Sequence, residues 1–195
     1  MKKKNSEKLV NATFYEHINL VNQTLKIIGK KIEKSSGIIS KSLKSGGTVF
    51  WCGNGGSAAD SQHIAAEFVG RFKKDRKPLR SIALTTDTSI LTCISNDYNF
   101  DKIFSRQLQA IGRKGDVLVV ITTSGDSKNI KEALIQAKKM KIKTIGLLGK
   151  GGGKCKNYVD IPLIVPSNQT ARIQEMHILI EHLFCELVEN NLALN

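Results

Sequence analysis

Residues 116–127 read DVLVVITTSGDS: an apolar run, VLVVI, leads directly into a loop of hydroxyl-bearing residues with one glycine. A continuous apolar run rich in β-branched residues is typical of a strand buried on both faces, as in a parallel sheet. A helical pattern follows at 129–140, so the loop joins the carboxyl end of a strand to the start of a helix. Ligands of open α/β sheets bind at such loops. The stretch therefore predicts an α/β fold with a ligand site at this loop.

Four other short apolar segments are also predicted to be strands, at 48–52, 81–85, 144–148 and 161–165. Helical patterns separate them, and a strand–helix–strand connection in one sheet is almost always a right-handed crossover between parallel strands. The sequence thus predicts a three-layer αβα sandwich around a parallel sheet of about five strands.

Helices are predicted at both ends of this core. Apolar residues recur every three or four positions from Phe14 to Ile28, and a second helical stretch at 32–43 ends at Ser45-Gly46-Gly47. The last helix is expected at about 170–189. We therefore predict one domain over 1–195, with N-terminal helices in 1–45 and the α/β core with its C-terminal helix in 46–195.

The composition narrows the class of protein. The chain has 30 Lys plus Arg against 17 Asp plus Glu, a net charge of +13, which attracts anionic metabolites. The basic runs resemble solvated helix ends and loops, so we expect no nucleic-acid partner. Four widely spaced cysteines without a C-x-x-C pair indicate reduced thiols and a cytoplasmic location. No apolar stretch reaches the length of a membrane span, so we expect no membrane association.

A first glycine-rich loop, CGNGGS at 52–57, lies between a predicted strand and a predicted helix. Its glycines let the backbone approach an anion at the helix N-terminus. Gly53, Gly55 and Ala58 also fit the G-x-G-x-x-A dinucleotide fingerprint, but the nearest acid at the end of the next strand, Asp87, comes 34 residues after Gly53 rather than about 20. A tight turn without a ligand is the third interpretation.

The second loop, TTSGDS at 122–127, carries four hydroxyls at a helix start, which can surround a phosphate monoester without a cationic side chain. Alternatively, Asp126 only caps the helix. The segment LGKGGGKC at 148–155 is not a P-loop, because it lacks the first glycine and the Ser or Thr of that motif.

Two helices carry candidate chemistry. His63 and Glu67 are four residues apart, so both can point to one atom and serve a metal or acid–base site; a surface hydrogen bond is the simpler alternative. The last helix contains RIQEMH at 172–177 and Glu181-His182 amid Ile, Leu and Phe. One face of that helix either lines a pocket or is an ordinary solvated face.

Four segments resemble the sugar isomerase (SIS) family, and within it the phosphoheptose isomerases: CGNGGSAADSQHIAAEFVGRF, ALTTDTSILTCISNDYNFDKIFSRQ, TTSGDS and VPSNQTARIQEMHILIEH. The similarity extends over about residues 10–190. It implies an SIS-type, flavodoxin-like fold. It also implies an aldose–ketose isomerase that interconverts sedoheptulose 7-phosphate and D-glycero-D-manno-heptose 7-phosphate through an enediolate. That reaction begins the synthesis of nucleotide-activated heptoses for lipopolysaccharide or capsule.

The resemblance also implies site residues and a cofactor. One zinc ion per subunit would be held by His63, Glu67, Gln174 and His182. Glu67 is our candidate for the base and His182 for its proton-transfer partner, so both would have two roles. The substrate would contact Glu67 and Gln174 and the following residues: Asn54, Gly55, Gly56, Asn96, Asp97, Thr122, Thr123, Ser124 and Ser127.

The spacing of two of these ligands suggests more than one subunit at the site. Gln174 and His182 are eight residues apart, which is about 12 Å along a helix and about 80° around it. They can share one ion only if both side chains reach toward each other or if one comes from a neighbouring subunit. Family members are similar in being homotetramers, so we predict self-association with intersubunit active sites.

Two other functions remain open at this stage. Some SIS relatives are non-catalytic adaptors that bind the replication initiator DnaA, but as a group they depart from the family at the acid–base positions, which are present here as Glu67 and His182. Others are sugar-phosphate-binding regulatory proteins fused to a DNA-binding module.

Overall fold

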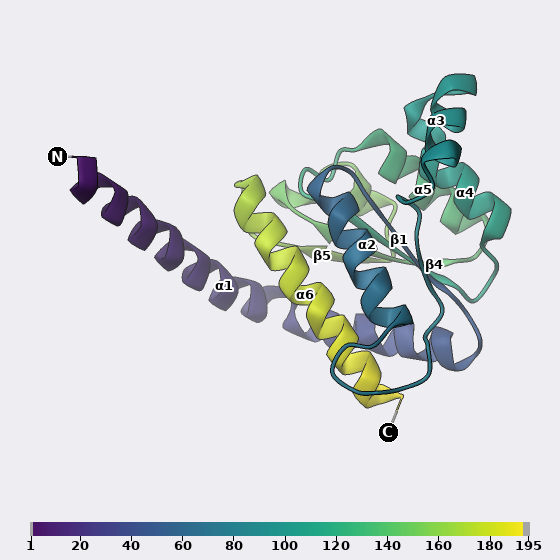
Figure 1. Ribbon diagram of the computed structural model, residues 1–195, viewed down its shortest axis with the longest axis horizontal. Helices are drawn as coiled ribbons and strands as arrows, with labels where there is room; N and C mark the ends of the chain where they lie inside the picture. Colours follow the sequence, from purple (N-terminus) through teal and green to yellow (C-terminus); the bar gives the residue numbers. More distant parts are fainter. Residues whose placement is uncertain (1, 193–195) are drawn as a thin grey trace.

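The computed structural model describes residues 2–192, and a five-stranded parallel sheet forms its centre (Figure 1). The strands are β1 (Val49–Gly53), β2 (Ser81–Ala83), β3 (Val117–Thr122), β4 (Lys143–Leu148) and β5 (Ile161–Ile164). Their order is β2-β1-β3-β4-β5, with every pair parallel. The chain therefore winds outward in opposite directions from the β1–β3 pair, and the loops after these two strands flank the switch point where ligands of such sheets bind.

Helices cover both faces of the sheet. The helices α1 (Lys2–Lys44), α2 (Gly56–Val69) and α6 (Thr170–Asn191) pack on one face, and α3 (Thr88–Asp97), α4 (Ile103–Ile111) and α5 (Lys128–Lys139) lie on the other. Alternate residues of β3 serve the two layers: Val117 and Val119 face α2 and α6, and Leu118 and Val120 face α4 and α5. Short 3₁₀ turns occur at Phe100–Lys102, Lys150–Gly152 and Cys155–Asn157.

The predicted three-layer sandwich and its parallel five-stranded sheet are confirmed. The prediction of separate N-terminal helices is wrong: residues 2–44 form one continuous helix. The helix runs without interruption through the expected break between Ile28 and Ile32, and the hydroxyls of Ser35 and Ser36 just beyond it donate to the Lys31 and Glu33 carbonyls within the same helix. The helices α3 and α4 form the helical connection expected between β2 and β3, for which no bounds were predicted.

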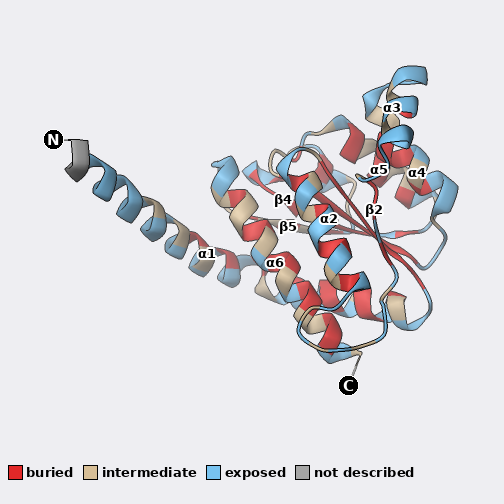
Figure 2. Cartoon of the chain, in the orientation of Figure 1, coloured by how far each residue is buried: buried red, intermediate tan, exposed pale blue. Residues whose placement is uncertain are grey.

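The first half of α1 projects from the body of the protein, as Figures 1 and 2 show. Phe14, Ile18 and Leu25 of its apolar repeat are 68%, 52% and 67% exposed. Leu20 and Ile28 instead join the core, together with residues further along the helix. The periodicity thus identified a helix correctly, but most of the apolar positions used to find it do not pack on this chain's sheet.

Among the described residues, no helix is both long and apolar enough to cross a membrane. The four cysteines are free thiols, and three of them are buried.

Candidate active site

The loop after β3 gathers hydroxyl groups at the start of α5. The Thr122 hydroxyl lies 3.3 Å from that of Ser124 and 3.2 Å from that of Ser127. The loop turns tightly at Gly125, whose φ is +70° and whose N–H donates to the Thr122 hydroxyl. Asp126 does not cap the helix, because its carboxylate accepts the Lys154 N–H at 2.9 Å and the N-cap position is Ser127. The loop therefore presents hydroxyls and a helix N-terminus to the switch point.

The loop after β1 is tied to the hydroxyl loop by a pair of amides. Asn54 donates to the Asn129 side chain at 2.9 Å, and Asn129 donates back at 2.8 Å. Asn129 is 2% exposed and belongs to the first turn of α5. Both glycine-rich and hydroxyl-rich loops are thus fixed relative to each other. Asn129 is a residue that the sequence analysis missed.

Gln174 of α6 lies against the same glycine loop. A Cβ atom on Gly56 would lie 2.3 Å from Gln174 Nε2, so only glycine leaves room for this side chain. The Gln174 amide donates to Asp60 of α2 at 3.0 Å. Burial raises the pKa of Asp60, although the Gln174 hydrogen bond and the nearby His63 oppose the increase. Gln174 therefore connects α6 to the glycine loop and to the start of α2.

One turn further along α2, His63 meets His182 of α6. Their Nε2 atoms are 3.0 Å apart and their rings meet edge to face. The carboxylate of Glu67 lies 3.8 Å from His63 Nε2, and its side chain is 25% exposed. The structure thus brings three predicted site residues, from two helices, into one cluster that retains access to solvent.

The donor set of this cluster suits zinc in part. Two imidazole nitrogens 3.0 Å apart are close to the separation expected of two ligands on one tetrahedral zinc ion, and a carboxylate is a common third ligand. However, within residues 2–192 no three His, Cys, Asp or Glu side chains already converge on one metal position. The Gln174 amide is bonded to Asp60, which leaves its carbonyl oxygen as the possible ligand atom. The two histidines fit the metal directly; Glu67 and Gln174 would have to turn toward it.

Asn96 and Asp97 lie apart from this cluster, at the exposed end of α3. In the described chain they hydrogen-bond to each other at 2.9 Å, and Cys93 donates to Asp97 at 3.4 Å. These two contacts, from Asn96 first, hold the pKa of Asp97 below its ordinary value. Asp87, the acid considered for a dinucleotide site, caps α3 by accepting the Ile90 N–H at 2.9 Å.

Comparison with known proteins agrees with this geometry. A family model described as "SIS domain" matches residues 13–149. A phosphoheptose isomerase of Aliarcobacter butzleri is 50% identical over 180 residues, which are 92% of this chain and 95% of the relative. A phosphoheptose isomerase of Clostridium acetobutylicum is 56% identical over 163 residues, 84% of this chain and 83% of the relative.

Solved structures show the same similarity in three dimensions. The phosphoheptose isomerase of Neisseria gonorrhoeae superimposes with a TM-score of 0.89 at 43% identity, over 94% of this chain and 98% of that one.

Proposed function

The chain belongs to the SIS domain family and to its phosphoheptose isomerase branch, and from this premise we propose that it interconverts sedoheptulose 7-phosphate and D-glycero-D-manno-heptose 7-phosphate. The observation that carries the proposal is the chain of contacts across the switch point. Asn54 and Asn129 join the two anion loops, and the glycine loop runs directly into α2, which carries His63 and Glu67. Gln174 ties α6, the helix of His182, to the same junction. These contacts support a site in which the proposed phosphate loop and the proposed proton-transfer side chains are held by neighbouring elements of one fold.

The hydroxyl loop is the proposed phosphate site. Thr122, Ser124 and Ser127 offer hydroxyls, and the N-terminus of α5 favours an anion through its free N–H groups and dipole. A net charge of +13 draws an anionic substrate to the protein. Phosphate binding at this loop would leave the sugar carbons to reach toward α2 and α6.

The isomerisation requires a base and a second proton carrier. In the direction from ketose to aldose, a base removes a proton from C1, an enediolate forms, and a proton is returned to C2 while another moves from O1 to O2. Glu67 is the proposed base, and His182, which shares a short contact with His63, is the proposed carrier between the oxygens. The half-buried position of Glu67 suits a carboxylate that must meet a substrate carbon and still exchange protons with water.

We also propose one zinc ion per subunit, held by His63, Glu67, Gln174 and His182. The support is the pair of facing imidazole nitrogens with a carboxylate beside them. A zinc ion would supply Lewis-acid stabilisation to the oxyanion that develops on the substrate. Glu67 and His182 would each serve either as a ligand or as a proton-transfer group, and only a side chain free of the ion could take the second role.

Self-association into a homotetramer, with active sites between subunits, is part of the proposal. The exposed apolar side chains of α1 include Leu9, Phe14 and Leu25, each at least 67% exposed, and such a surface commonly marks an interface. A hollow of about 460 Å³ between α1 and α6 is lined by Phe14, Leu179 and also His182, so a partner covering it would approach the proposed site.

Turnover of sedoheptulose 7-phosphate by the wild type and by Glu67→Gln, with the zinc content of both, tests the function. We expect turnover in the wild type and a loss of at least about 10²-fold in the variant, the usual contribution of a general base. Glu186→Gln is the matched control, because Glu186 is an exposed glutamate of α6 that pairs with Lys73. A folded, zinc-loaded wild type without turnover would contradict the proposal and favour a sugar-phosphate-binding or DnaA-binding role.

A further inference from the structure

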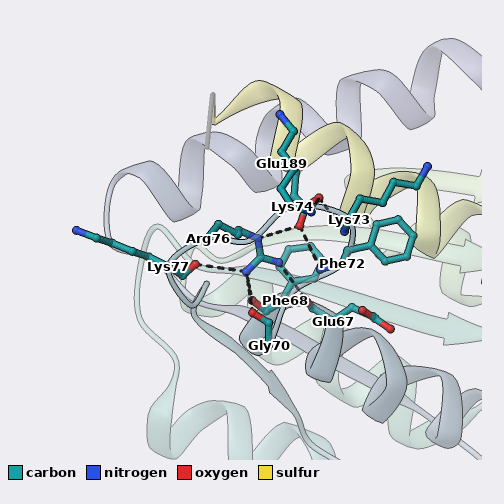
Figure 3. Close-up of polar contacts among 9 residues, drawn as sticks. All are labelled: Glu67, Phe68, Gly70, Phe72, Lys73, Lys74, Arg76, Lys77 and Glu189. Carbon is teal, nitrogen blue, oxygen red and sulfur yellow. Dashed lines mark hydrogen bonds and ion pairs between the residues drawn. The ribbon is translucent and has the colours of Figure 1, made fainter. Parts of the chain in front are cut away.

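The segment between α2 and β2, residues 70–80, is held by a buried ion pair. Arg76 Nε donates to Glu189 Oε1 of α6 at 3.0 Å, and the two side chains are only 1% and 2% exposed (Figure 3). Surface ion pairs contribute little, but the loss of one partner of a buried pair leaves an uncompensated charge. An ion pair buried this deeply, in a segment without regular structure, suggests that it has a specific structural or functional role.

Arg76 closes the end of α2. Its guanidinium donates to the carbonyls of Glu67 and Phe68, each at 2.8 Å. The last carbonyls of a helix have no partner within the helix, and a cation there also interacts favourably with the helix dipole. Arg76 therefore fixes the backbone of Glu67, the proposed base, at the point where the helix would otherwise fray.

Glu189, the acidic partner of this ion pair, binds the backbone of the segment that follows α2. Its carboxylate accepts the backbone N–H groups of Phe72, Lys73 and Lys74, each at 3.2 Å. Burial by itself raises the pKa of Glu189, but these N–H groups and the Arg76 guanidinium outweigh it and hold the pKa below its ordinary value. The carboxylate is thus ionised when the ion pair is formed, and it anchors the backbone at Phe72.

The ring of Phe72 packs nearly parallel to the imidazole of His182. The two rings are stacked, with centroids 5.5 Å apart and planes 14° apart. His182 meets His63 at its edge, so its orientation is set by one neighbour on its face and another at its Nε2 atom. The position of Phe72 in turn depends on the N–H bond that it makes to Glu189.

We propose that Arg76 and Glu189 are a positioning pair for the isomerase. This buried ion pair aligns Glu67 through the end of α2, and it aligns His182 through the stacked ring of Phe72. The inference deepens the proposed function and rests on its assignment of Glu67 and His182. Neither Arg76 nor Glu189 needs to touch the substrate. Their effect is on the geometry of the two groups that exchange protons with it.

The test compares Glu189→Gln and Phe72→Leu with the control Glu186→Gln. Glu189→Gln keeps the shape of the side chain and removes its charge, and Phe72→Leu removes the stack on His182 while the ion pair stays. Glu186→Gln removes an exposed ion pair with Lys73, whose side chains are 42% and 57% exposed, on the same helix. We expect kcat to fall on the order of tenfold or more in the first two proteins, with KM changed less than about twofold, because small misplacements of catalytic groups cost rate. The control should keep the wild-type kcat.

Phe72→Leu keeps the test decisive even where Glu189→Gln unfolds, because it leaves the buried charges paired. An unchanged kcat in folded Phe72→Leu, or a loss in Glu186→Gln as large as that in Glu189→Gln, would overturn the proposal.

Histidine-selective ¹⁵N labelling supplies a readout that does not depend on activity. The His182 ring signals should shift in Phe72→Leu and Glu189→Gln and stay in place in Glu186→Gln. A wild type that binds zinc but turns over no substrate would refute the proposed function alone, and the ring signals would still decide whether the pair positions His182. Unmoved ring signals in both variants would refute the positioning role.

Discussion

His177 is fully buried on α6, and we expect it to make the protein less stable as the pH falls below about 6.5. Burial lowers the pKa of His177 from 6.5 to about 4, with a partial offset from the Leu148 carbonyl. Between these two values the unfolded chain binds a proton that the folded chain does not, so acid favours unfolding. The loss of stability is at most a few tenths of a kcal/mol at pH 7 and above, about 2 kcal/mol at pH 5 and about 3 kcal/mol at pH 4.

The variant His177→Leu removes this titration. Urea unfolding of wild type and variant at pH 7 and pH 5, at one protein concentration, gives four free energies of unfolding. The packing cost of the substitution is the same at both pH values and cancels in the comparison. We expect the variant to gain about 2 kcal/mol relative to the wild type on going from pH 7 to pH 5. An equal difference at the two pH values would show that His177 is not held neutral by burial.

Three further predictions follow from buried or exposed groups. Burial raises the pKa of Glu181, whose carboxyl oxygens have no hydrogen-bond partner in the described chain. Glu181→Leu should therefore raise the free energy of unfolding, measured in urea at pH 7, by about 1–3 kcal/mol, and a decrease would contradict this. Gly125→Ala would place a Cβ 2.4 Å from the Gly152 backbone, so the Tm should fall and KM should rise. Gly37→Ala, at an exposed position of α1 where a Cβ would meet nothing within 4 Å, should neither lower the Tm nor raise KM. Phe14→Glu should shift light scattering toward smaller species, and an unchanged mass would place the subunit contact elsewhere.

The sheet could be predicted because its signal is local. The run VLVVI is apolar without a break, and burial on both faces produces that composition, so β3 and its neighbours were placed to within one or two residues. Helix α1 shows the limit of the same reasoning. Its repeat indicates an amphipathic helix, but nothing in the period says whether the apolar face meets this chain's core or another surface.

The sequence supplies candidate site residues but not their arrangement. Its contacts join positions far apart in the sequence: Asn54 with Asn129, and His63 with His182. No spacing rule encodes such pairs, because the first depends on the pairing of β1 with β3 and the second on the packing of α2 and α6 against the same face of the sheet. Asn129 and Arg76 were missed for this reason, since each looks like an ordinary polar residue until its distant partner is known.

The packing of α2 against α6 determines what the ambiguous His63–Glu67 pair can do. On one helix the pair is equally compatible with a surface hydrogen bond, and only a second imidazole 3.0 Å from His63 gives it the character of an acid–base or metal cluster. That imidazole, His182, is carried by the helix whose far end holds Glu189 and whose near end holds Gln174. The contact between α2 and α6 is thus held at one end by Gln174 against the glycine loop and at the other end by the Arg76–Glu189 ion pair. A substitution that loosens the Arg76 end should therefore affect proton transfer before it affects phosphate binding, because the hydroxyl loop belongs to β3 and α5 and is tied only to the glycine loop at the other end.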